Sequence, residues 1–221
     1  MTASDKLAEI YAKRFDKQGH ESRERIWRLL CRRFFDRRME TEGSVLELGC
    51  GHCEFINNID VRTRYAVDLN PDSERVVHAD VIFRRTPADQ LAFLDDNSID
   101  RIFTSNFLEH LHDKRACDRV LTEALRVLKP GGHFIALGPN IRYVFDQYWD
   151  FYDHYLPLSH VSLAEGLEIN GFEVIENIPR FLPYSMQSKL PTADVLIIVY
   201  LRMRLLWPLV GKQFLITARK P

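Results

Sequence analysis

The chain has few of the features that mark a secreted, membrane-spanning or nucleic-acid-binding protein. It has four cysteines in 221 residues, too few and too scattered for a disulfide framework, which favours a reducing compartment. Its N-terminus is polar and charged, unlike a secretion signal. Its longest apolar stretch, residues 195–210, is interrupted by Arg202, Arg204 and Pro208 and is too short to span a bilayer. These absences predict a cytoplasmic protein.

Charge is nearly balanced, with a formal net charge of −1, but it is unevenly distributed along the chain. Residues 1–42 carry a net charge of +3, residues 43–194 carry −9, and residues 195–221 carry +5. A nucleic-acid groove needs clustered positive charge, and the acidic middle argues against one. We therefore predict no nucleic-acid partner.

Short apolar runs alternate with helical segments, which predicts an open, largely parallel α/β sheet with right-handed crossovers. Strands are predicted at residues 44–49, 64–70, 80–85, 99–106, 133–140, 172–178 and 213–220. Helices are predicted at 4–17, 21–39 and 113–128, and a further one is expected to begin at Ser162 as its cap. The length suits one domain over residues 1–221. It divides into N-terminal helices (1–42), a core (43–179 and 212–221) and an insertion (180–211).

The loop after the first strand, LGCGHCE, is the first candidate site, because such sheets bind ligands at the carboxyl ends of their strands. Gly49 and Gly51 allow the backbone to turn sharply and to approach a ligand closely. A dinucleotide fingerprint would have its third glycine at Glu54, and a carboxylate there would repel a pyrophosphate. The loop therefore disfavours an NAD(P)-linked oxidoreductase, which stays open as an alternative.

Glu47, Gly49, Cys50 and Gly51 occur together with two further motifs, TSNFLEHLHD at 104–113 and LRVLKPGGHFIALGPN at 125–140. The combination resembles the class I, Rossmann-like methyltransferases that use S-adenosylmethionine. The resemblance covers roughly residues 40–180 and the final strand. It implies a seven-stranded, mostly parallel sheet with an antiparallel last strand and helices on both faces. It also implies that Glu47 faces the cationic amino-acid end of the cofactor, since an anionic pocket suits a sulfonium and an ammonium group.

The same resemblance assigns cofactor contacts to later strand ends. Asp68 lies 17 residues after Gly51, and an acid there can accept both ribose hydroxyls. The family usually has an acid after the third strand, where this chain has Pro87, and Asp80 lies before that strand. Adenine contacts are therefore expected from Ala88 and Asp89. The predicted cofactor-binding residues are Glu47, Gly49, Cys50, Gly51, Asp68, Leu69, Ala88, Asp89 and Asn106.

Glu109 and His110 are expected to begin the helix after the fourth strand. Some relatives, such as the ubiquinone-biosynthesis O-methyltransferases, hold a metal with an acid, a Glu and a His at these positions. Here the first position is Asn106, so no metal is predicted. His110 is a candidate proton acceptor, and its alternative role is to brace the loop. Cys50 and Cys53 lack the second Cys-x-x-Cys of a structural zinc site, and the glycine pattern is wrong for a redox motif.

The loop after the fifth strand, residues 138–163, is rich in aromatic, acidic and histidine residues and is expected to form the acceptor wall. It resembles a subgroup of bacterial methyltransferases from polysaccharide or natural-product pathways. Asp153 and His154 can accept a hydroxyl proton, and Arg142 can bind a phosphate or carboxylate. The predicted substrate-binding residues are Asn140, Arg142, Tyr143, Trp149, Tyr152 and Asp153, and the predicted catalytic residues are His110 and His154.

The sequence therefore predicts S-adenosylmethionine-dependent O-methylation of a small-molecule or saccharide-type acceptor. N- or C-methylation, a non-catalytic binding protein and an oxidoreductase remain alternatives. Residues 195–210 are expected to cover the site, to form a dimer surface or to contact a membrane surface. The oligomeric state and the acceptor stay open.

Overall fold

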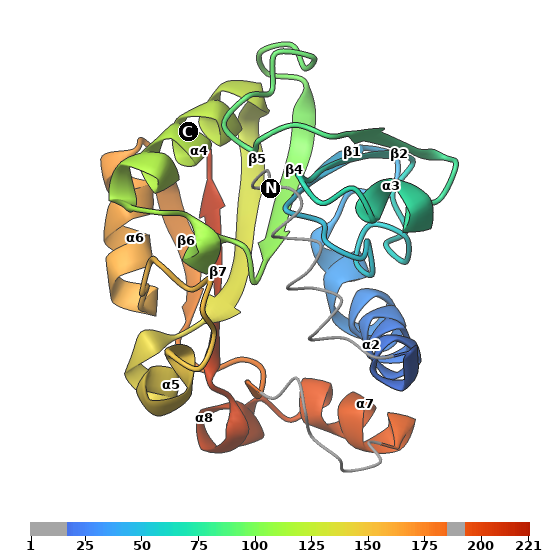
Figure 1. The fold of residues 1–221 in the computed structure, drawn as a ribbon, viewed down its shortest axis with the longest axis vertical. Helices are drawn as coiled ribbons and strands as arrows, with labels where there is room; N and C mark the ends of the chain where they lie inside the picture. The colour runs from blue at the N-terminus through green and yellow to red at the C-terminus, as the bar shows by residue number, and fades with distance from the viewer. Residues whose placement is uncertain (1–16, 185–192) are drawn as a thin grey trace.

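A computed structural model describes residues 17–184 and 193–221 and shows a seven-stranded sheet in the order β3-β2-β1-β4-β5-β7-β6 (Figure 1). The strands are β1 (Ser44–Leu48), β2 (Thr63–Val67), β3 (Val81–Arg84), β4 (Ile99–Ser105), β5 (Leu128–Pro139), β6 (Glu173–Ile178) and β7 (Gln213–Arg219). Strands β1 to β5 run parallel, and β7 is antiparallel to both β5 and β6. The predicted Rossmann-like fold and its antiparallel last strand are confirmed.

The central strand β1 shows why these apolar runs form buried strands. Successive side chains of a strand point to opposite faces of the sheet. Leu46 and Leu48 accordingly pack into one apolar core, and Val45 packs into a second core on the other face. Every residue of β1 is buried, so Glu47, on the same face as Val45, is a carboxylate held inside the protein.

Helices cover both faces of the sheet. They are α2 (Lys17–Leu30), α3 (Ser73–Val76), α4 (Lys114–Val127), α5 (Ile141–Tyr148), α6 (His160–Ile169), α7 (Asp194–Arg202) and α8 (Trp207–Val210). Side chains of α4 and α6 contribute to one core, and side chains of α2, α7 and α8 to the other. The predicted helix at 4–17 lies outside the described residues apart from its last position. The helix predicted at 21–39 is α2, extended by a π-helical turn (Cys31–Phe35) and a 3-10 turn (Asp36–Arg38).

Two predicted helix starts are wrong. Ser159, not Ser162, caps α6: its hydroxyl accepts a hydrogen bond from the Ser162 amide at 3.1 Å, and the Ser162 hydroxyl accepts one from the Ser159 amide at 2.9 Å. A serine three residues into the helix thus takes the place usually held by Glu in a capping box. Glu109 and His110 do not begin α4, because they lie in a 3-10 turn (Leu108–His110) and Asp113 caps the helix.

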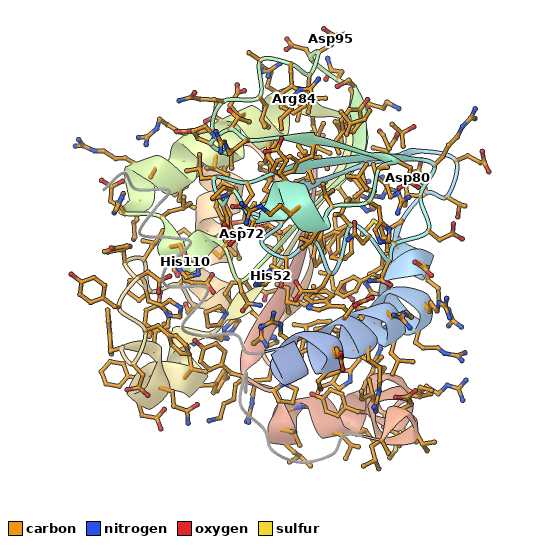
Figure 2. All side chains as sticks on the ribbon, turned by 45° about the vertical axis from the view of Figure 1, so that its right-hand side comes forward. His52, Asp72, Asp80, Arg84, Asp95 and His110 are labelled. Carbon is orange, nitrogen blue, oxygen red and sulfur yellow. The ribbon has the colours of Figure 1, made fainter. Side chains whose placement is uncertain are left out.

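The strand order reverses between β1 and β4, because the chain first extends the sheet through β2 and β3 and then returns to the other side of β1. In open α/β sheets, ligands bind in the crevice that this reversal creates at the carboxyl ends of the strands. His52 follows β1 and His110 follows β4, and both lie away from Asp95, which precedes β4 (Figure 2). No helix within the described residues is long and apolar enough to cross a bilayer.

Candidate cofactor and acceptor site

The loop after β1 turns through glycines in a backbone conformation that side chains disfavour. Gly49 has φ +70° and Gly51 has φ +51°. The amides of Gly49 and Cys50 donate to the Val67 carbonyl at 3.0 and 3.2 Å, and the Gly51 amide donates to the Asp68 carboxylate at 2.6 Å. The loop after β1 is therefore held against the end of β2, where the cofactor contacts are predicted.

Gly49→Ala is expected to destabilise the protein through two separate costs. A Cβ at Gly49 would lie 2.4 Å from a ring carbon of Phe107, and it would also adopt a left-handed backbone. Gly131 is the matched control, because its φ is +76° but a Cβ there would meet nothing within 4 Å. We expect Gly131→Ala to lower the free energy of unfolding by about 1 kcal/mol and Gly49→Ala by about 3 kcal/mol in urea denaturation. Equal losses would show that Phe107 does not restrict the loop.

A buried carboxylate, Glu47, and a partly buried one, Asp68, lie beside this loop. The Glu47 carboxylate accepts a hydrogen bond from the Ile56 amide at 3.1 Å, and burial raises its pKa well above the ordinary value, with Cys53, Glu54 and Asp68 adding to the rise. Burial also raises the pKa of Asp68, although backbone amides and His110 oppose the rise. A cationic ligand beside such carboxylates would favour their ionised form. The carboxylates of Glu47 and Asp68 therefore fit the positive sulfonium and ammonium groups of S-adenosylmethionine.

Asp68 also has the structural role that an aspartate in a strand-end turn often takes, which is to cap the turn. Besides the Gly51 amide, its carboxylate accepts the Asn70 amide at 2.7 Å. The Leu69 backbone also bonds this carboxylate, and since each carboxylate oxygen has two acceptor positions, capacity remains for a ribose hydroxyl. Asp68 thus joins the loop after β1 to the loop after β2 and has remaining capacity for a ligand.

Glu54 stands where a dinucleotide fingerprint would have its third glycine. It forms an ion pair with Arg23 of α2 at 3.0 Å. Its side chain therefore occupies the position where a dinucleotide-binding loop needs close backbone packing. The pKa of Cys50 is raised, mainly by its contact with the Cys53 thiol and secondly by burial. A raised pKa disfavours the thiolate that metal binding or redox chemistry needs.

The predicted adenine side is less completely assembled. Ala88 is buried, and Asp89 forms an ion pair with Arg119 of α4 at 2.9 Å. Leu69 is exposed at the end of β2. Asp80, before β3, pairs with Arg64 at the start of the neighbouring strand. Asp80 therefore lies at the edge of the sheet opposite to the carboxyl ends.

The loop predicted to form the acceptor wall, residues 138–163, is called the acceptor loop below. Main-chain hydrogen bonds fix it to the turn after β4. The amides of Tyr155 and Leu156 both donate to the Glu109 carbonyl, at 2.9 and 3.0 Å. This connection brings Asp153 and His154 to His110, although they are more than 40 residues apart in the chain. The structure thus places the two predicted catalytic histidines together, with ring centroids 5.0 Å apart.

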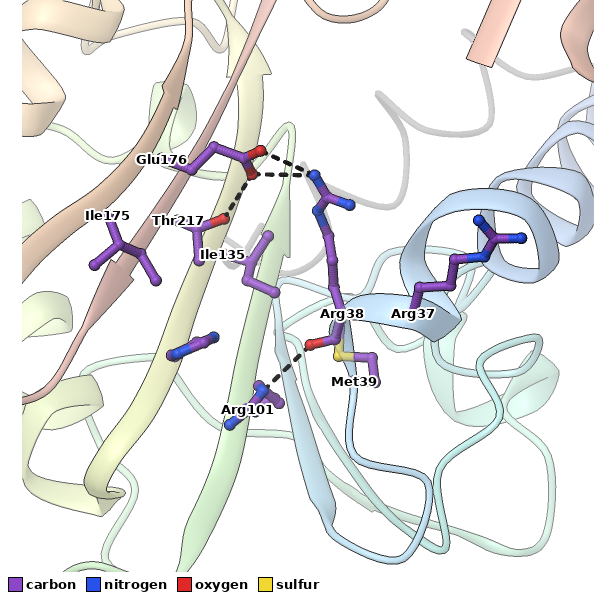
Figure 3. Close-up of a pocket in the computed structure, with 9 residues that line it drawn as sticks. Arg37, Arg38, Met39, Arg101, Ile135, Ile175, Glu176 and Thr217 are labelled. Atoms are coloured by element: carbon purple, nitrogen blue, oxygen red, sulfur yellow. Dashed lines mark hydrogen bonds and ion pairs between the residues drawn. The ribbon is translucent and has the colours of Figure 1, made fainter. Parts of the chain in front are cut away.

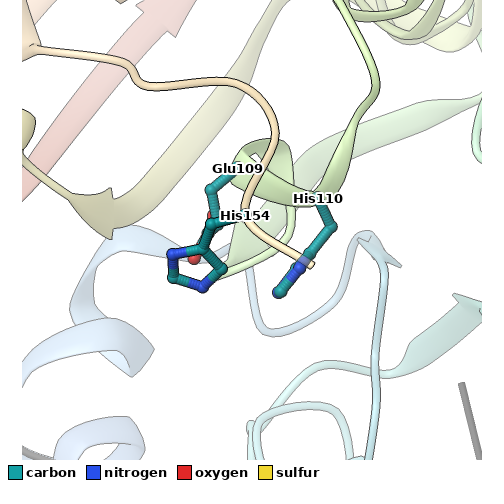
Figure 4. A group of neighbouring side chains, drawn as sticks. All are labelled: Glu109, His110 and His154. Atoms are coloured by element: carbon teal, nitrogen blue, oxygen red, sulfur yellow. The ribbon is translucent and has the colours of Figure 1, made fainter. Parts of the chain in front are cut away.

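Glu109, His110 and His154 converge from the turn and the loop (Figure 4). Their ligand atoms all lie within 4.8 Å of one another, so the set can pass a proton or bind a divalent cation. Burial raises the pKa of Glu109 to about 7, the His110 charge opposes this rise, and Asp153 adds to it. The sequence indicated Glu109 only as a structural residue, because its burial depends on the distant loop.

Glu109→Gln is expected to stabilise the chelator-treated protein at high pH. Between the ordinary carboxyl pKa of 4.5 and the folded value of about 7, the folded protein retains a proton that the unfolded chain has lost. The free energy of unfolding therefore falls as pH rises through this window and stays level above it. Glutamine does not ionise, so the variant's advantage should grow by roughly 2–3 kcal/mol between pH 5 and pH 8.

Denaturant melts at both pH values measure this difference. Glu47 also has a raised pKa and changes the free energy of unfolding with pH equally in the parent chain and in Glu109→Gln. Its contribution therefore cancels in the difference between them. The control is Glu42→Gln, because that side chain is 84% exposed and its replacement should leave the pH dependence unchanged. A constant stability difference for Glu109→Gln would show that the buried carboxyl does not titrate in this range.

Aromatic side chains hold His154 in place. Its ring packs on Phe151 and Tyr148, with centroids 4.7 Å from each, and the Tyr148 hydroxyl donates to the Leu156 carbonyl at 2.7 Å. Neither aromatic residue was among the predicted site residues. Their place in the aromatic acceptor loop was the available signal, but their orientation was not predictable.

The remaining predicted substrate residues occupy two different environments. Asn140 is buried, caps α5, and donates through its amide group to the Pro179 carbonyl at 2.8 Å, so its side chain holds the loop. Arg142, Tyr143, Trp149 and Tyr152 are exposed, Tyr152 at 88%.

Asn106, which is predicted to contact the cofactor, follows β4 with φ +48°. It lies at the same edge of the sheet as the loop after β1.

A separate hollow of about 360 Å³ lies between the segment after α2 and the strands β4, β5, β7 and β6 (Figure 3). Arg38 forms an ion pair with Glu176 at 3.0 Å, and the Arg101 guanidinium donates to the Arg38 carbonyl at 3.2 Å. Its basic groups are thus used to attach the segment after α2 to β4 and β6. The predicted catalytic residues His110 and His154 do not line it.

The strand order, and the glycine loop beside the buried Glu47 and the partly buried Asp68, are those of the Rossmann-like methyltransferase fold. Residues 46–136 match the family described as a methyltransferase domain. That part of the chain is therefore similar to the methyltransferase domains, and S-adenosylmethionine is the cofactor that this similarity implies.

Individual proteins are similar to this chain in sequence or in fold. The chain is 33% identical over 146 residues to a probable S-adenosylmethionine-dependent methyltransferase of Mycolicibacterium smegmatis. The match covers 62% of this chain and 54% of the relative, so the chain spans about half the length of the curated relative. A methyltransferase structure from Thermotoga maritima has a TM-score of 0.69 at 18% identity and covers 97% of this chain and 100% of that one.

The same fold also supports other chemistry. The [4+2]-cyclase SpnF has a TM-score of 0.59 at 19% identity, with 90% of this chain and 80% of that chain covered. At such identities the likeness concerns the fold alone, because one fold supports many functions. The reaction must therefore be argued from the site.

Proposed function

We propose that this protein is an S-adenosylmethionine-dependent methyltransferase that methylates an oxygen of a small-molecule or saccharide-type acceptor. The observation that carries this proposal is the orientation of His110 at the edge shared with Asp68. Its Nδ1 atom lies 2.9 Å from the Asp153 carbonyl oxygen and 3.3 Å from the Asp153 carboxylate.

Both of these neighbours are oxygen acceptors, so Nδ1 must carry the hydrogen. The tautomer follows, because the second nitrogen, Nε2, then presents a lone pair and can accept a proton. A carboxylate that holds a histidine in this way also stabilises the imidazolium that forms after proton transfer. His110 is thereby suited to take the proton of an acceptor hydroxyl.

Glu47, Asp68 and the Gly49–Gly51 backbone would hold the cofactor, and the cofactor when bound supplies a methyl group activated by its sulfonium. The histidines lie on the neighbouring turn and loop. The charge of protonated His110 opposes the rise in the Asp68 pKa, so the proposed proton acceptor lies within electrostatic reach of the predicted ribose ligand. Positioning an acceptor oxygen between them would supply much of the rate.

The exposed aromatic residues of the acceptor loop support the saccharide-type assignment. Tyr143, Trp149 and Tyr152 present apolar faces and polar edges to solvent along one segment. Arg180 lies over the Tyr143 ring at 4.8 Å, which adds a positive charge to this surface. Such a surface suits a polyhydroxylated or anionic acceptor.

Calorimetry with S-adenosylhomocysteine and with NADH tests the cofactor assignment. We expect binding of S-adenosylhomocysteine and none of NADH, and the opposite result would overturn the proposal. A screen of hydroxylated, amine and carbon acceptors with methyl-labelled S-adenosylmethionine then tests the acceptor. Labelling of amines alone would contradict O-methylation.

Glu109, His110 and His154, called the histidine set below, offer a second role. The same three side chains can bind a divalent cation. The labelled-cofactor assay should therefore be repeated after treatment with a chelator. Unchanged activity supports proton transfer by His110. Loss of activity that a divalent cation restores would assign the set to cation binding instead.

A further inference from the structure

The segment formed by α7 and α8, residues 194–210, has an unusually apolar outer surface. Leu205 is 86% exposed and Leu209 is 72% exposed. Further exposed apolar side chains of the segment are Val195, Leu196, Val199, Met203 and Val210. Exposed apolar side chains that occur singly need no explanation, but a contiguous group of them indicates a contact surface.

The opposite side of this segment is firmly anchored. Ile197, Leu201 and Trp207 are buried in the core that contains α2, and the Trp207 indole donates to the Tyr200 carbonyl at 2.9 Å. The guanidinium of Arg180 donates to the Gly211 carbonyl at 2.6 Å. The exposed leucines are therefore presented by a packed element and not by a loosely attached one.

Positive charge accompanies the apolar side chains. Arg202 and Arg204 are exposed, and residues 195–211 contain no acidic residue. The helix α2 packs beside α7, and α2 together with the helical turns that follow it, residues 17–38, contains eight basic and three acidic residues. The nearest acid of α7, Asp194, is paired with Arg25 at 2.6 Å.

The segment also lies at the functional edge of the sheet. Helices α5, α7 and α8 are found beyond the carboxyl ends of β4 and β5 (Figure 1). The turn with His110 follows β4, and the acceptor loop follows β5. A surface that bound this segment would face the same edge as the candidate site.

We propose that residues 194–210 form an interfacial element that binds the surface of an anionic lipid bilayer. Leucine and valine side chains enter the boundary between headgroups and acyl chains, while Arg202 and Arg204 contact anionic headgroups. A second copy of this chain is a poorer occupant. A two-fold interface would place the same patch against itself and bring arginines together without acids to pair them.

The test is flotation of the 221-residue chain with vesicles of phosphatidylcholine alone or with 30% phosphatidylglycerol added. We expect binding only to the anionic vesicles, decreasing as salt is raised. The double variant Leu205→Glu/Leu209→Glu and the double variant Arg202→Glu/Arg204→Glu should each lower the partition coefficient at least about tenfold. Ile169→Glu on α6 is the matched control, because Ile169 is 77% exposed and should bind like the parent chain.

Calorimetry with S-adenosylhomocysteine and thermal melts show that each variant remains folded, and neither readout depends on acceptor methylation. Absence of binding to anionic vesicles would overturn the proposal. Equal binding by the leucine variant or the arginine variant would overturn it as well. If the parent chain does not float but forms a dimer that Leu205→Glu/Leu209→Glu dissociates, the patch is a dimer surface and the lipid assignment is wrong.

Discussion

Replacing His110 with alanine is expected to lower kcat for the best acceptor of the labelled-cofactor screen by about 10³-fold, within the range of general-base catalysis. Nδ1 of His110 is held by Asp153, and in the proposed mechanism Nε2 accepts the proton, so alanine would remove both the base and its orientation. Binding of S-adenosylhomocysteine should change little. The measurement is initial-rate kinetics with kcat and KM determined separately.

His112→Ala is the matched control for His110→Ala. His112 lies two residues later and is exposed, with its ring 4.8 Å from that of Tyr155. Its loss should change kcat by less than about twofold, since it lies outside the histidine set. Equal kcat values for the parent chain and His110→Ala, with KM alone raised, would show that His110 positions the acceptor and does not take its proton.

Replacing Asp68 with alanine is expected to weaken S-adenosylhomocysteine binding at least tenfold, or about 1.4 kcal/mol. The carboxylate has acceptor capacity for the ribose hydroxyls, and it also holds the amides of Gly51 and Asn70. Alanine therefore removes a ligand contact and two contacts within the loops. Isothermal titration calorimetry measures the loss directly.

Two further variants separate these effects. Asp72→Ala removes an acid four residues later that pairs with Arg75 on the surface at 2.9 Å, and affinity should be unchanged. Asp68→Asn retains an acceptor oxygen for one backbone amide but loses the charge, so intermediate affinity is expected. If Asp68→Ala binds S-adenosylhomocysteine as tightly as the parent chain, the ribose assignment is wrong.

The sequence by itself determined the sheet and the loop that begins the site. Apolar runs such as Ser44–Leu48 form buried strands because burial and strand periodicity are local properties of the chain. Gly49 and Gly51 could be recognised for a similar reason, since a left-handed turn restricts the residue type at that position. The missing glycine at Glu54 likewise argued against a dinucleotide site, and its side chain is paired with Arg23.

Only the tertiary structure decided how the second half of the site is assembled. Asp153 and His154 reach His110 because the backbone of the acceptor loop is bonded to the Glu109 carbonyl, and no local pattern records that contact. The same contact buries the Glu109 carboxyl and raises its pKa to about 7. Tautomers, pKa values and exposed faces depend on neighbours that are distant in sequence, so they follow from packing.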